Sequence, residues 1–259
     1  MGVSVAFMGY REHPVPAPWR ALAECGWTST APAAPERVAV LPDGCMDLVW
    51  SGAELLVAGP DTAPHPYTRA PGLVATGLRF RPGVLPALLG VPAAPLRDAR
   101  VPLEALHPRI AQGAVAAIGG GADAAAVLTA LAARLPGGPP EPALGLVAAR
   151  LAQGISATDT ADALGWTTRT LHRHCLAAFG YGPATLRRVL RFRRALALLH
   201  RGVPAAETAA RAGYADQPHL SREVRALAGA APGRLAQPAQ PARSANRSTP
   251  VPSGSSTDA

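Results

Sequence analysis

One stretch, GYADQPHLSREVRALAG at residues 213–229, decides the fold of the C-terminal half of this chain. Its apolar residues Leu220, Val224 and Leu227 are spaced by four and three, which places them on one side of a helix. Charged side chains such as Arg222 then face the other way. A glycine and a short polar turn precede this helix, so the stretch predicts a turn followed by an amphipathic helix with arginines on its free face.

The same pattern occurs earlier in the chain. TADALGW at 160–166 matches TAARAGY at 208–214 with an offset of 48 residues, and HRHCLAAFGYGP at 172–183 matches SREVRALAGAAP at 221–232 with an offset of 49. The change of offset indicates a one-residue insertion in the second turn. Internal similarity of this kind indicates two copies of one structural unit.

Each copy reads as a helix, a glycine turn and a second helix. The first helices are expected at 156–164 and 204–212, and Gly165 or Gly213 then ends each of them because glycine accepts the left-handed conformation. This is the arrangement of a helix-turn-helix unit, whose second helix enters the DNA major groove. Two ordinary helical hairpins of a bundle are the alternative. The units are predicted at 156–179 and 204–228, with a linking helix at 183–200.

The charge distribution favours the DNA-binding interpretation. The chain carries a net charge of +8, and all 25 of its basic residues are arginines. Residues 1–142 hold 10 arginines and 11 acidic residues, whereas residues 143–235 hold 13 arginines and 5 acidic residues, a net charge of +8. A positive charge confined to one segment is typical of a nucleic-acid-binding module.

Proline and glycine mark the boundary between two domains. RLPGGPPEPALG at 134–145 excludes regular structure, and the residues after 235 lack apolar periodicity. We therefore expect the last segment to be a disordered tail. The predicted organisation is an N-terminal domain at 1–135, a linker at 136–144, a C-terminal all-α domain at 145–235 and the tail at 236–259.

The N-terminal half reads as a small α+β domain. Short runs rich in β-branched and apolar residues alternate with Pro, Gly and Asp, which predicts an antiparallel sheet. The expected strands are RVAVLP (37–42), CMDLVW (45–50), ELLVAG (54–59) and LVATGLRFR (73–81). Helices are expected at 82–89, 102–118 and 122–135.

The C-terminal residues resemble a known family. GWTTRTLHRHCLAAFGYGPATLRRVLRFRRALALL and AAETAARAGYADQPHLSREVRALAGAAPGRL are similar to the DNA-binding domain of AraC-type transcriptional regulators, over residues 145–235. The resemblance implies two helix-turn-helix subdomains joined by the long helix at 183–200. It also implies that one molecule places two reading helices about 34 Å apart, one turn of DNA.

The resemblance also implies which side chains contact DNA. Arginine can bind guanine and glutamine can bind adenine through two hydrogen bonds each. An alternative for Arg173 and Arg222, which are equivalent in the repeat, is one structural ion pair each. The base-reading residues implied are Arg169, His172, Arg173, Gln217, His219 and Arg222. Phosphate-contacting or supporting residues implied are Thr167, Thr168, Asp216, Ser221, Arg225 and Arg188.

The N-terminal half resembles a second kind of domain. LPDGCMDLVW, AGPDT and RFRPG are similar to the sensor half of an actinobacterial-type branch of these regulators, over about residues 8–107. Such halves are generally β-rich and cupin-like, and they serve as small-molecule sensors or as dimerisation domains. The resemblance therefore implies a sensor or dimerisation role without naming a ligand.

A cluster in this half invites a metal or nucleophile interpretation. Strand alternation places Asp43, Cys45 and Asp47 on one face, yet no histidine lies at a ligand spacing from them. The alternative is a turn capped by Asp43 with a polar strand face beyond it. His65, flanked by prolines, is expected in a loop. Ligand contact is left open for Asp47, Trp50 and Arg79.

Several functional classes are disfavoured by the sequence. No apolar run approaches the roughly 20 residues of a membrane span, and the start of the chain lacks the pattern of a secretory signal. Three scattered cysteines suit a reducing cytoplasm. AraC-type domains also occur fused to DNA-repair alkyl transferases with a zinc-activated cysteine, but three unclustered cysteines cannot build a four-cysteine zinc site.

The sequence therefore predicts a cytoplasmic, non-enzymatic transcriptional regulator that needs no cofactor and no metal. Its expected partner is double-stranded DNA at a promoter or operator. RNA polymerase, a small-molecule effector and a second copy of the chain remain open as further partners. An enzymatic N-terminal half of the alkyl-transfer type is the alternative function.

Overall fold

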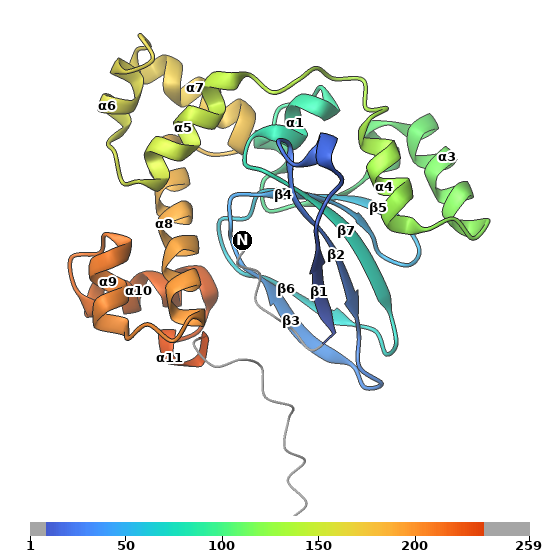
Figure 1. Ribbon diagram of the computed structural model, residues 1–259, viewed down its shortest axis with the longest axis horizontal. Coiled ribbons are helices and arrows are strands. Elements are labelled where there is room, and N and C mark those ends of the chain that lie inside the picture. Colours follow the sequence, from blue (N-terminus) through green and yellow to red (C-terminus); the bar gives the residue numbers. More distant parts are fainter. Residues whose placement is uncertain (1–8, 236–259) are drawn as a thin grey trace, which may run out of the picture.

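The computed structural model describes residues 9–235, so the tail predicted to be disordered at 236–259 lies outside the described residues. Two domains stand side by side (Figure 1), an N-terminal domain built on an antiparallel sheet and a C-terminal domain of helices alone. The predicted fold class is confirmed. None of the helices in the described ranges is long and apolar enough to cross a membrane.

Two antiparallel sheets form the framework of the N-terminal domain. The larger has six strands in the order β1–β2–β7–β4–β5–β8, and the smaller pairs β3 with β6. The strands of the larger sheet are β1 Tyr10–His13, β2 Ala23–Thr30, β7 Val74–Phe80, β4 Met46–Trp50, β5 Leu55–Ala58 and β8 Arg100–Pro102. Those of the smaller sheet are β3 Glu36–Val40 and β6 His65–Arg69.

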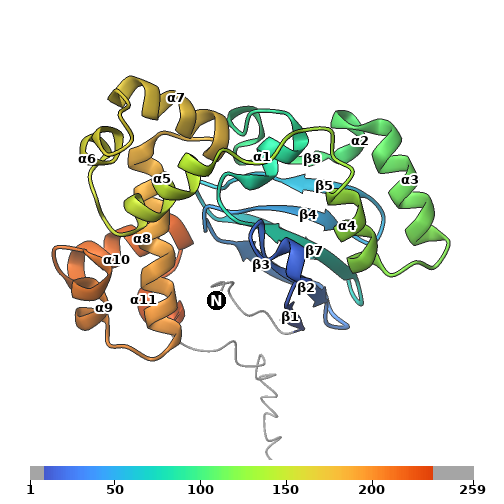
Figure 2. The ribbon, with the colours of Figure 1, turned by 45° about the horizontal axis from the view of Figure 1, so that its top comes forward.

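The large sheet has a different neighbour on each face. Because side chains alternate along a strand, Met46 and Leu48 of β4 enter the core beneath the helices, whereas Asp47 faces the other side. Helices cover the first face, and the small sheet lies over the second (Figure 2). The helices are α1 Val84–Leu89, α2 Leu103–Leu106, α3 Pro108–Gly119 and α4 Ala124–Ala132, with short 3₁₀ turns η1 Ala17–Trp19 and η2 Ala94–Leu96.

The four predicted strands and three predicted helical regions are present, with two kinds of difference. The helix expected at 102–118 is interrupted at His107, because the residue before Pro108 is pushed out of the helical conformation; its φ is −141°. Four strands had no clear signal. β1 and β8 are very short, β2 mixes small and polar residues, and β6 contains a proline.

The C-terminal domain has two hydrophobic cores joined by one long helix. α8 runs over Pro183–His200 and contributes Leu186 to the first core and Phe192 to the second (Figure 1). The first core lies among α5 Pro142–Ala152, α6 Ala157–Asp162 and α7 Thr168–Phe179. The second lies among α9 Ala205–Ala212, α10 Gln217–Ala228 and α11 Pro232–Leu235.

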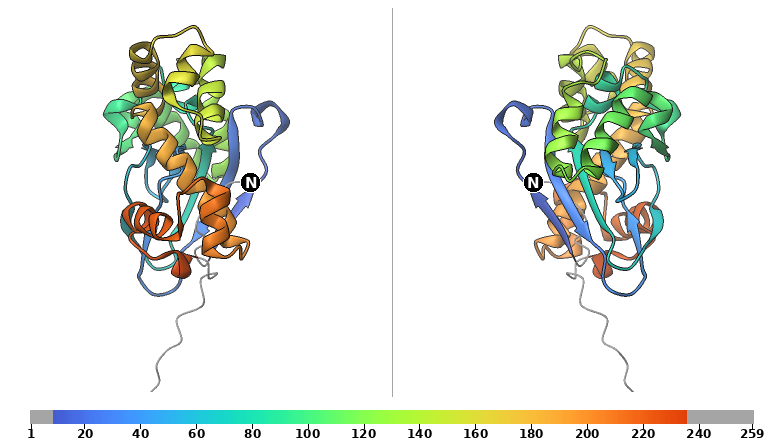
Figure 3. Two further views of the ribbon diagram at one scale, coloured as in Figure 1. Left: turned by 90° about the vertical axis from the view of Figure 1, so that its left-hand side faces the viewer. Right: turned by 90° about the vertical axis from the view of Figure 1, so that its right-hand side faces the viewer.

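The two domains are in direct contact. At the end of α7, the carbonyl of Ala177 accepts a hydrogen bond of 2.7 Å from the backbone N–H of Ala93. Leu41, just after β3, packs against the core around α9 and α10. Figure 3 shows α8 running along the flank of the sheet domain. Both helix-turn-helix units therefore touch the N-terminal domain.

Candidate nucleic-acid interface and N-terminal pocket

Side-chain caps define where the two candidate reading helices begin. At the start of α7, the hydroxyl oxygen of Thr167 accepts a 3.1 Å hydrogen bond from the backbone N–H of Thr170. At the start of α10, Asp216 accepts one of 2.6 Å from the N–H of His219. Both are N-caps, which satisfy backbone donors that the helix itself leaves unpaired. Thr167 and Asp216 thus have an observed role in fixing the helix ends.

The residues implied to read bases are mostly exposed, on the first two turns of α7 and α10. His219 is the exception, being half-buried. Arg173 and Arg222 form no ion pair with any residue between 9 and 235, so the alternative of a structural ion pair finds no support within that range. Exposed on these helices are Arg169, His172, Arg173, Gln217 and Arg222.

Helix α10 is tied to α8 through Glu223. The Nε of Arg188 donates to Glu223 at 2.8 Å, and Arg191 lies 3.7 Å from the same carboxylate. The guanidinium of Arg191 also stacks over the Tyr214 ring, 4.5 Å from its centroid. Arg188, implied to contact phosphate, is therefore engaged inside the domain. The contact between Arg191 and Glu223 was not predicted from the sequence, since only the packing of α10 on α8 brings the two side chains together.

Two histidines of the interface have internal partners. His219 accepts a hydrogen bond of 3.3 Å at Nδ1 from the backbone N–H of Ala215 and lies edge-on to Tyr214. His174 stacks on Trp166 and lies 3.1 Å from Glu141, just before α5. His219 thus helps to shape the turn that precedes α10. Of the other supporting residues implied, Thr168 and Arg225 are exposed and Ser221 is half-buried.

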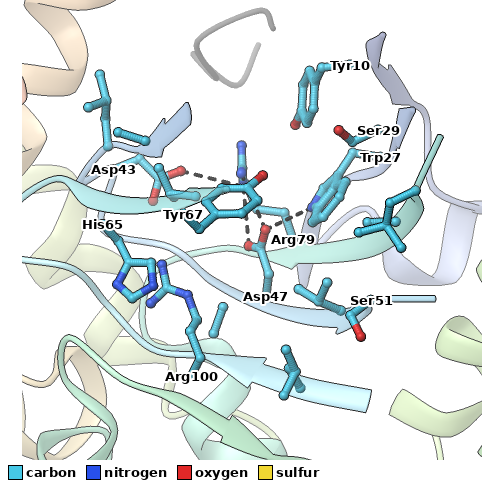
Figure 4. Close-up of a pocket in the computed structure, with 18 residues that line it drawn as sticks. Tyr10, Trp27, Ser29, Asp43, Asp47, Ser51, His65, Tyr67, Arg79 and Arg100 are labelled. Carbon is cyan, nitrogen blue, oxygen red and sulfur yellow. Dashed lines mark hydrogen bonds and ion pairs between the residues drawn. The ribbon is translucent and has the colours of Figure 1, made fainter. Parts of the chain in front are cut away.

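A cavity of about 290 Å³ lies between the two sheets of the N-terminal domain (Figure 4). Strands β2, β4, β5 and β7 form its floor, and β3 and β6 form its cover. Its lining is mostly apolar, with a few polar groups gathered at one place, as in many small-molecule sites. The apolar walls are Ala39, Val40, Leu41, Val49, Leu56, Ala58, Leu73 and Ala75.

Arg79 is the centre of the polar end of this cavity. Its Nε and Nη2 each donate to Asp47 at 3.3 Å, and its Nε lies 3.5 Å from Asp43 (Figure 4). Burial alone would lower the pKa of Arg79, but Asp47 and Asp43 hold it well above its ordinary value. Burial raises the pKa of Asp47, and Arg79 counteracts this. The arrangement is a buried ion pair shared among three side chains.

Trp27 forms one wall of the cavity because Gly77 leaves room for it. The two residues are paired across β2 and β7, and a Cβ on Gly77 would lie 2.1 Å from the indole ring. The indole N–H of Trp27 donates to Asp47 at 2.8 Å, and its ring lies 5.8 Å from that of Tyr10. Glycine at position 77 therefore positions both the aromatic wall and a hydrogen bond to the polar end.

The structure brings together two of the three side chains left open for ligand contact. Asp47 and Arg79 both line the cavity, but Trp50 does not. Trp50 packs against the core on the opposite face of the sheet, because it lies three positions, an odd number, after Asp47 on the strand. His65, expected in a loop, is the first residue of β6 and lines the cavity.

The three residues Asp43, Cys45 and Asp47 do not share one face. β4 begins only at Met46, and Gly44 before it has a φ of 84°, so the alternation does not extend back to Cys45. Asp43 accepts a hydrogen bond of 2.8 Å from the N–H of Cys45, which is the predicted turn cap. Asp43 faces Arg79, whereas the Cys45 sulfur lies 3.5 Å from Arg193 of α8.

The cysteines are poorly suited to nucleophilic chemistry. All three are buried, and burial raises the pKa of Cys25 and Cys175 to about 12 and that of Cys45 well above its ordinary value. They are therefore protonated thiols at neutral pH, and the thiolate is the reactive form. Among residues 9–235 there is no group of three or more His, Cys, Asp or Glu that could hold a metal ion.

A buried ion pair joins the pocket region to the helical domain. Glu24 of β2 bonds to Arg193, in the middle of α8, and the two side chains are only 10% and 18% exposed. The backbone of Gly44 also approaches α8, since a Cβ on it would lie 3.2 Å from a methyl group of Leu190. The turn that carries Asp43 is thus in contact with the helix that links the two helix-turn-helix units.

Comparison with known families gives two matches along the chain. Residues 160–237 match the model of a helix-turn-helix domain, and residues 11–102 match that of a domain of unknown function, DUF6597. The first match covers both candidate reading helices, and the second covers the pocket. No curated protein shows significant similarity to this chain.

Solved structures with a similar arrangement include those of ToxT from Vibrio cholerae. Apo ToxT with a lysine-to-alanine substitution is 10% identical, with a TM-score of 0.48 over 87% of this chain and 98% of that one. ToxT bound to (E)-4-(8-methylnaphthalen-1-yl)but-3-enoic acid is 9% identical, with a TM-score of 0.48 over 88% and 98%. ToxT bound to an unsaturated fatty acid is 9% identical, with a TM-score of 0.45 over 83% and 94%.

Proposed function

We propose that this chain is a DNA-binding transcriptional regulator that reads DNA with α7 and α10 of its AraC-type helix-turn-helix domain, under the control of its N-terminal pocket. The observation that carries the first part is the pair of repeat-equivalent arginines, Arg173 and Arg222. Both are exposed, and neither has an ion-pair partner within the described range. Free arginines at this place on a helix suit bidentate contacts with guanine.

The remaining contacts divide into base reading and support. Arg169, His172 and Gln217 lie on the same exposed turns and complete the two reading surfaces together with His219. Thr168 and Arg225 are free to reach phosphates, while Thr167 and Asp216 act through the helix caps. Arg188 supports α10 through Glu223. One molecule would thereby read two major-groove segments about 34 Å apart.

The second part of the proposal is a sensor role for the N-terminal domain. The cavity between its sheets is apolar, roomy enough for a small organic molecule and polar at one end only. A small-molecule effector that binds there is a further partner of this chain, beside promoter or operator DNA. RNA polymerase and a second copy of the chain complete the partners that a regulator of this kind would use.

A continuous series of contacts links the cavity to the DNA-binding helices. Arg79 in the cavity contacts Asp43, which caps the turn at Gly44 and Cys45. Cys45 in turn contacts Arg193 of α8, the helix that joins both helix-turn-helix units. An effector that alters the Arg79–Asp43 contact would therefore act on α8 through the turn at Gly44 and Cys45. Coupling of this kind is reciprocal, so DNA binding would alter effector affinity by the same factor.

Selection of binding sites from random DNA by the purified full-length chain tests the DNA-reading proposal. Arg173→Ala and Arg222→Ala should each weaken specific binding by roughly 1–3 kcal/mol and relax base preference at different positions of the site. Arg211→Ala is the matched control, because Arg211 is an exposed arginine of α9 paired with Glu207. Unchanged base preference in both reading-helix variants would show that neither arginine reads bases.

The sensor role is tested by a thermal-shift screen of metabolites against the full-length chain, followed by titration of the selected DNA site. A ligand of the folded chain raises the melting temperature with its concentration. It should then also change operator affinity. A ligand that stabilises the chain but leaves operator affinity unaltered would refute the sensor role and favour a dimerisation role for this domain.

A further inference from the structure

We infer that the N-terminal cavity selects an uncharged, ring-containing molecule that presents an oxygen acceptor to Arg79, and that it discriminates against carboxylates. This inference rests on the proposed sensor function and names the chemical class of its effector. Three features of the cavity carry it: an unpaired donor, an excess of acidic groups around that donor, and an aromatic wall beside it.

The unpaired donor is Nη1 of Arg79. The side chain is buried and lines the cavity, but Nη1 forms no hydrogen bond with residues 9–235. Glu12 lies 3.8 Å from it, which is too long for a hydrogen bond. Figure 4 shows the guanidinium between Asp43 and Asp47, with its outer end pointing away from Asp47. Because a buried donor without a partner is unfavourable, an acceptor supplied by a ligand would stabilise the complex.

The charges around Arg79 decide which acceptor fits. One guanidinium faces three carboxylates, those of Asp43, Asp47 and Glu12. The other cation of the cavity, Arg100, is held by Asp61 in two hydrogen bonds of 2.9 and 2.7 Å. Neither arginine therefore has positive charge left to neutralise an anion. A ligand carboxylate would meet net negative charge in a poorly solvated place, whereas a carbonyl, amide or hydroxyl oxygen would not.

A cation is also a poorer fit than a neutral acceptor. The group without a partner at this point is an N–H donor of Arg79, and an ammonium group cannot accept a hydrogen bond from it because it has donors only. The oxygens of Asp47 already accept hydrogen bonds from Arg79 and Trp27, and Asp43 accepts one from the N–H of Cys45. Burial and the charge of Arg100 lower the pKa of His65, so that side chain is neutral at neutral pH.

The walls of the cavity determine the size and shape of the apolar part of the ligand. Trp27 and Tyr67 line the cavity together with Tyr10, and the remaining walls are aliphatic. A cavity of about 290 Å³ lies just below the range typical of small-molecule sites, roughly 300–1,000 Å³, so only a small ligand fits. One or two fused rings with a short polar arm match this space, with the rings against the indole and the oxygen at Arg79.

Isothermal titration of the full-length chain with three matched probes tests the inference. Naphthaleneacetamide, naphthaleneacetate and naphthylethylamine share one ring system and differ in the charge of the arm. The amide should bind with a Kd at least about tenfold below that of the acetate, and below that of the amine, because it alone offers a neutral acceptor. Tighter binding of the acetate or of the amine would overturn the inference, as would no binding of the amide up to about 1 mM.

Two variants separate the charge argument from a general loss of folding. Asp43→Asn keeps an oxygen that can cap the turn but removes one negative charge beside Arg79, so the preference for amide over acetate should fall at least about threefold. Glu104→Gln removes the same charge from α2, outside the cavity lining, and should leave the preference unchanged. An unaltered preference in Asp43→Asn would refute the role of the acidic groups.

Operator affinity measured with and without the amide keeps this inference distinct from the proposed sensor function. If the amide binds with the expected preference but does not shift operator affinity, the ligand class stands and the sensor role fails. If the acetate binds more tightly and shifts operator affinity, the sensor role stands and the ligand class fails.

Discussion

Removing the carboxylate of Glu24 should destabilise the contact between the two domains by about 3 kcal/mol. The magnitude follows from the burial of the Glu24–Arg193 pair, whose side chains are 10% and 18% exposed. Loss of one partner from a fully buried pair costs roughly 3–5 kcal/mol because a buried charge is left unpaired, and the residual exposure places this pair at the lower end. In Glu24→Gln the amide oxygen can still accept a hydrogen bond from Arg193, but the guanidinium charge loses its counter-charge, and its other contact is with the Cys45 sulfur at 3.5 Å.

Thermal denaturation of the full-length variants measures this loss. For a chain of this size 1 kcal/mol corresponds to about 2–4 °C, so Glu24→Gln should lower the transition temperature by roughly 6–12 °C. If the domains unfold separately, the same loss should instead split one transition into two. The double variant Glu24→Leu/Arg193→Met should recover most of the stability, because apolar residues of similar size remove both buried charges together.

The matched control is an exposed pair of the same kind. Arg211 and Glu207 on α9 lie 3.2 Å apart, with side chains 55% and 51% exposed. Glu207→Gln should cost no more than about 0.5 kcal/mol, since exposed helical pairs contribute little. If Glu24→Gln proved no more destabilising than Glu207→Gln, the buried contact between sheet and α8 would not exist in solution, and the proposed route from cavity to DNA would lose its basis.

Two further predictions concern the cavity. Gly77→Ala should displace the Trp27 indole, break its 2.8 Å hydrogen bond to Asp47, lower the melting temperature of the chain and change its tryptophan emission. Gly72→Ala controls for backbone effects alone, because a Cβ there meets nothing within 4 Å although the φ of 69° is strained. Identical behaviour of the two variants would contradict the packing argument. Because burial lowers the pKa of His65, the folded chain binds fewer protons than the unfolded one below about pH 6.5, so stability should fall as the pH drops from about 7 to 5. In urea titrations at several pH values, His65→Gln should reduce the dependence of the unfolding free energy on pH. Part of that dependence persists because burial also lowers the pKa of His200. A pH dependence equal to that of the unmodified chain would refute the assignment to His65.

The sequence alone determined the helical domain because its signals are local. Apolar spacing, glycine at the helix ends and capping residues such as Asp216 all act within a few residues of one another. The repetition of the unit and the confinement of positive charge then indicated DNA binding, and the family comparison confirmed that class of function. The side chains proposed to read DNA came from the resemblance to AraC-type regulators and not from these local signals.

Only the tertiary structure decided which side chains of the N-terminal domain line its cavity and which enter its core. Alternation separates Asp47 from Leu48 but does not state which face meets the helices and which meets a second sheet, because both faces of this sheet are covered. Trp50, for which ligand contact had been left open, lies on the face that packs against the helices, and Cys45 lies before the start of the strand.

The long-range pairs have the same explanation. Arg79 meets Asp47 across 32 residues, and Arg193 meets Glu24 across 169 residues and two domains. No periodicity in either segment encodes these contacts, since they depend on the order of strands in the sheet and on how α8 packs against it. A residue's own neighbours set its secondary structure and its face, whereas its charge partner and the cavity it lines are set by elements that only folding brings together.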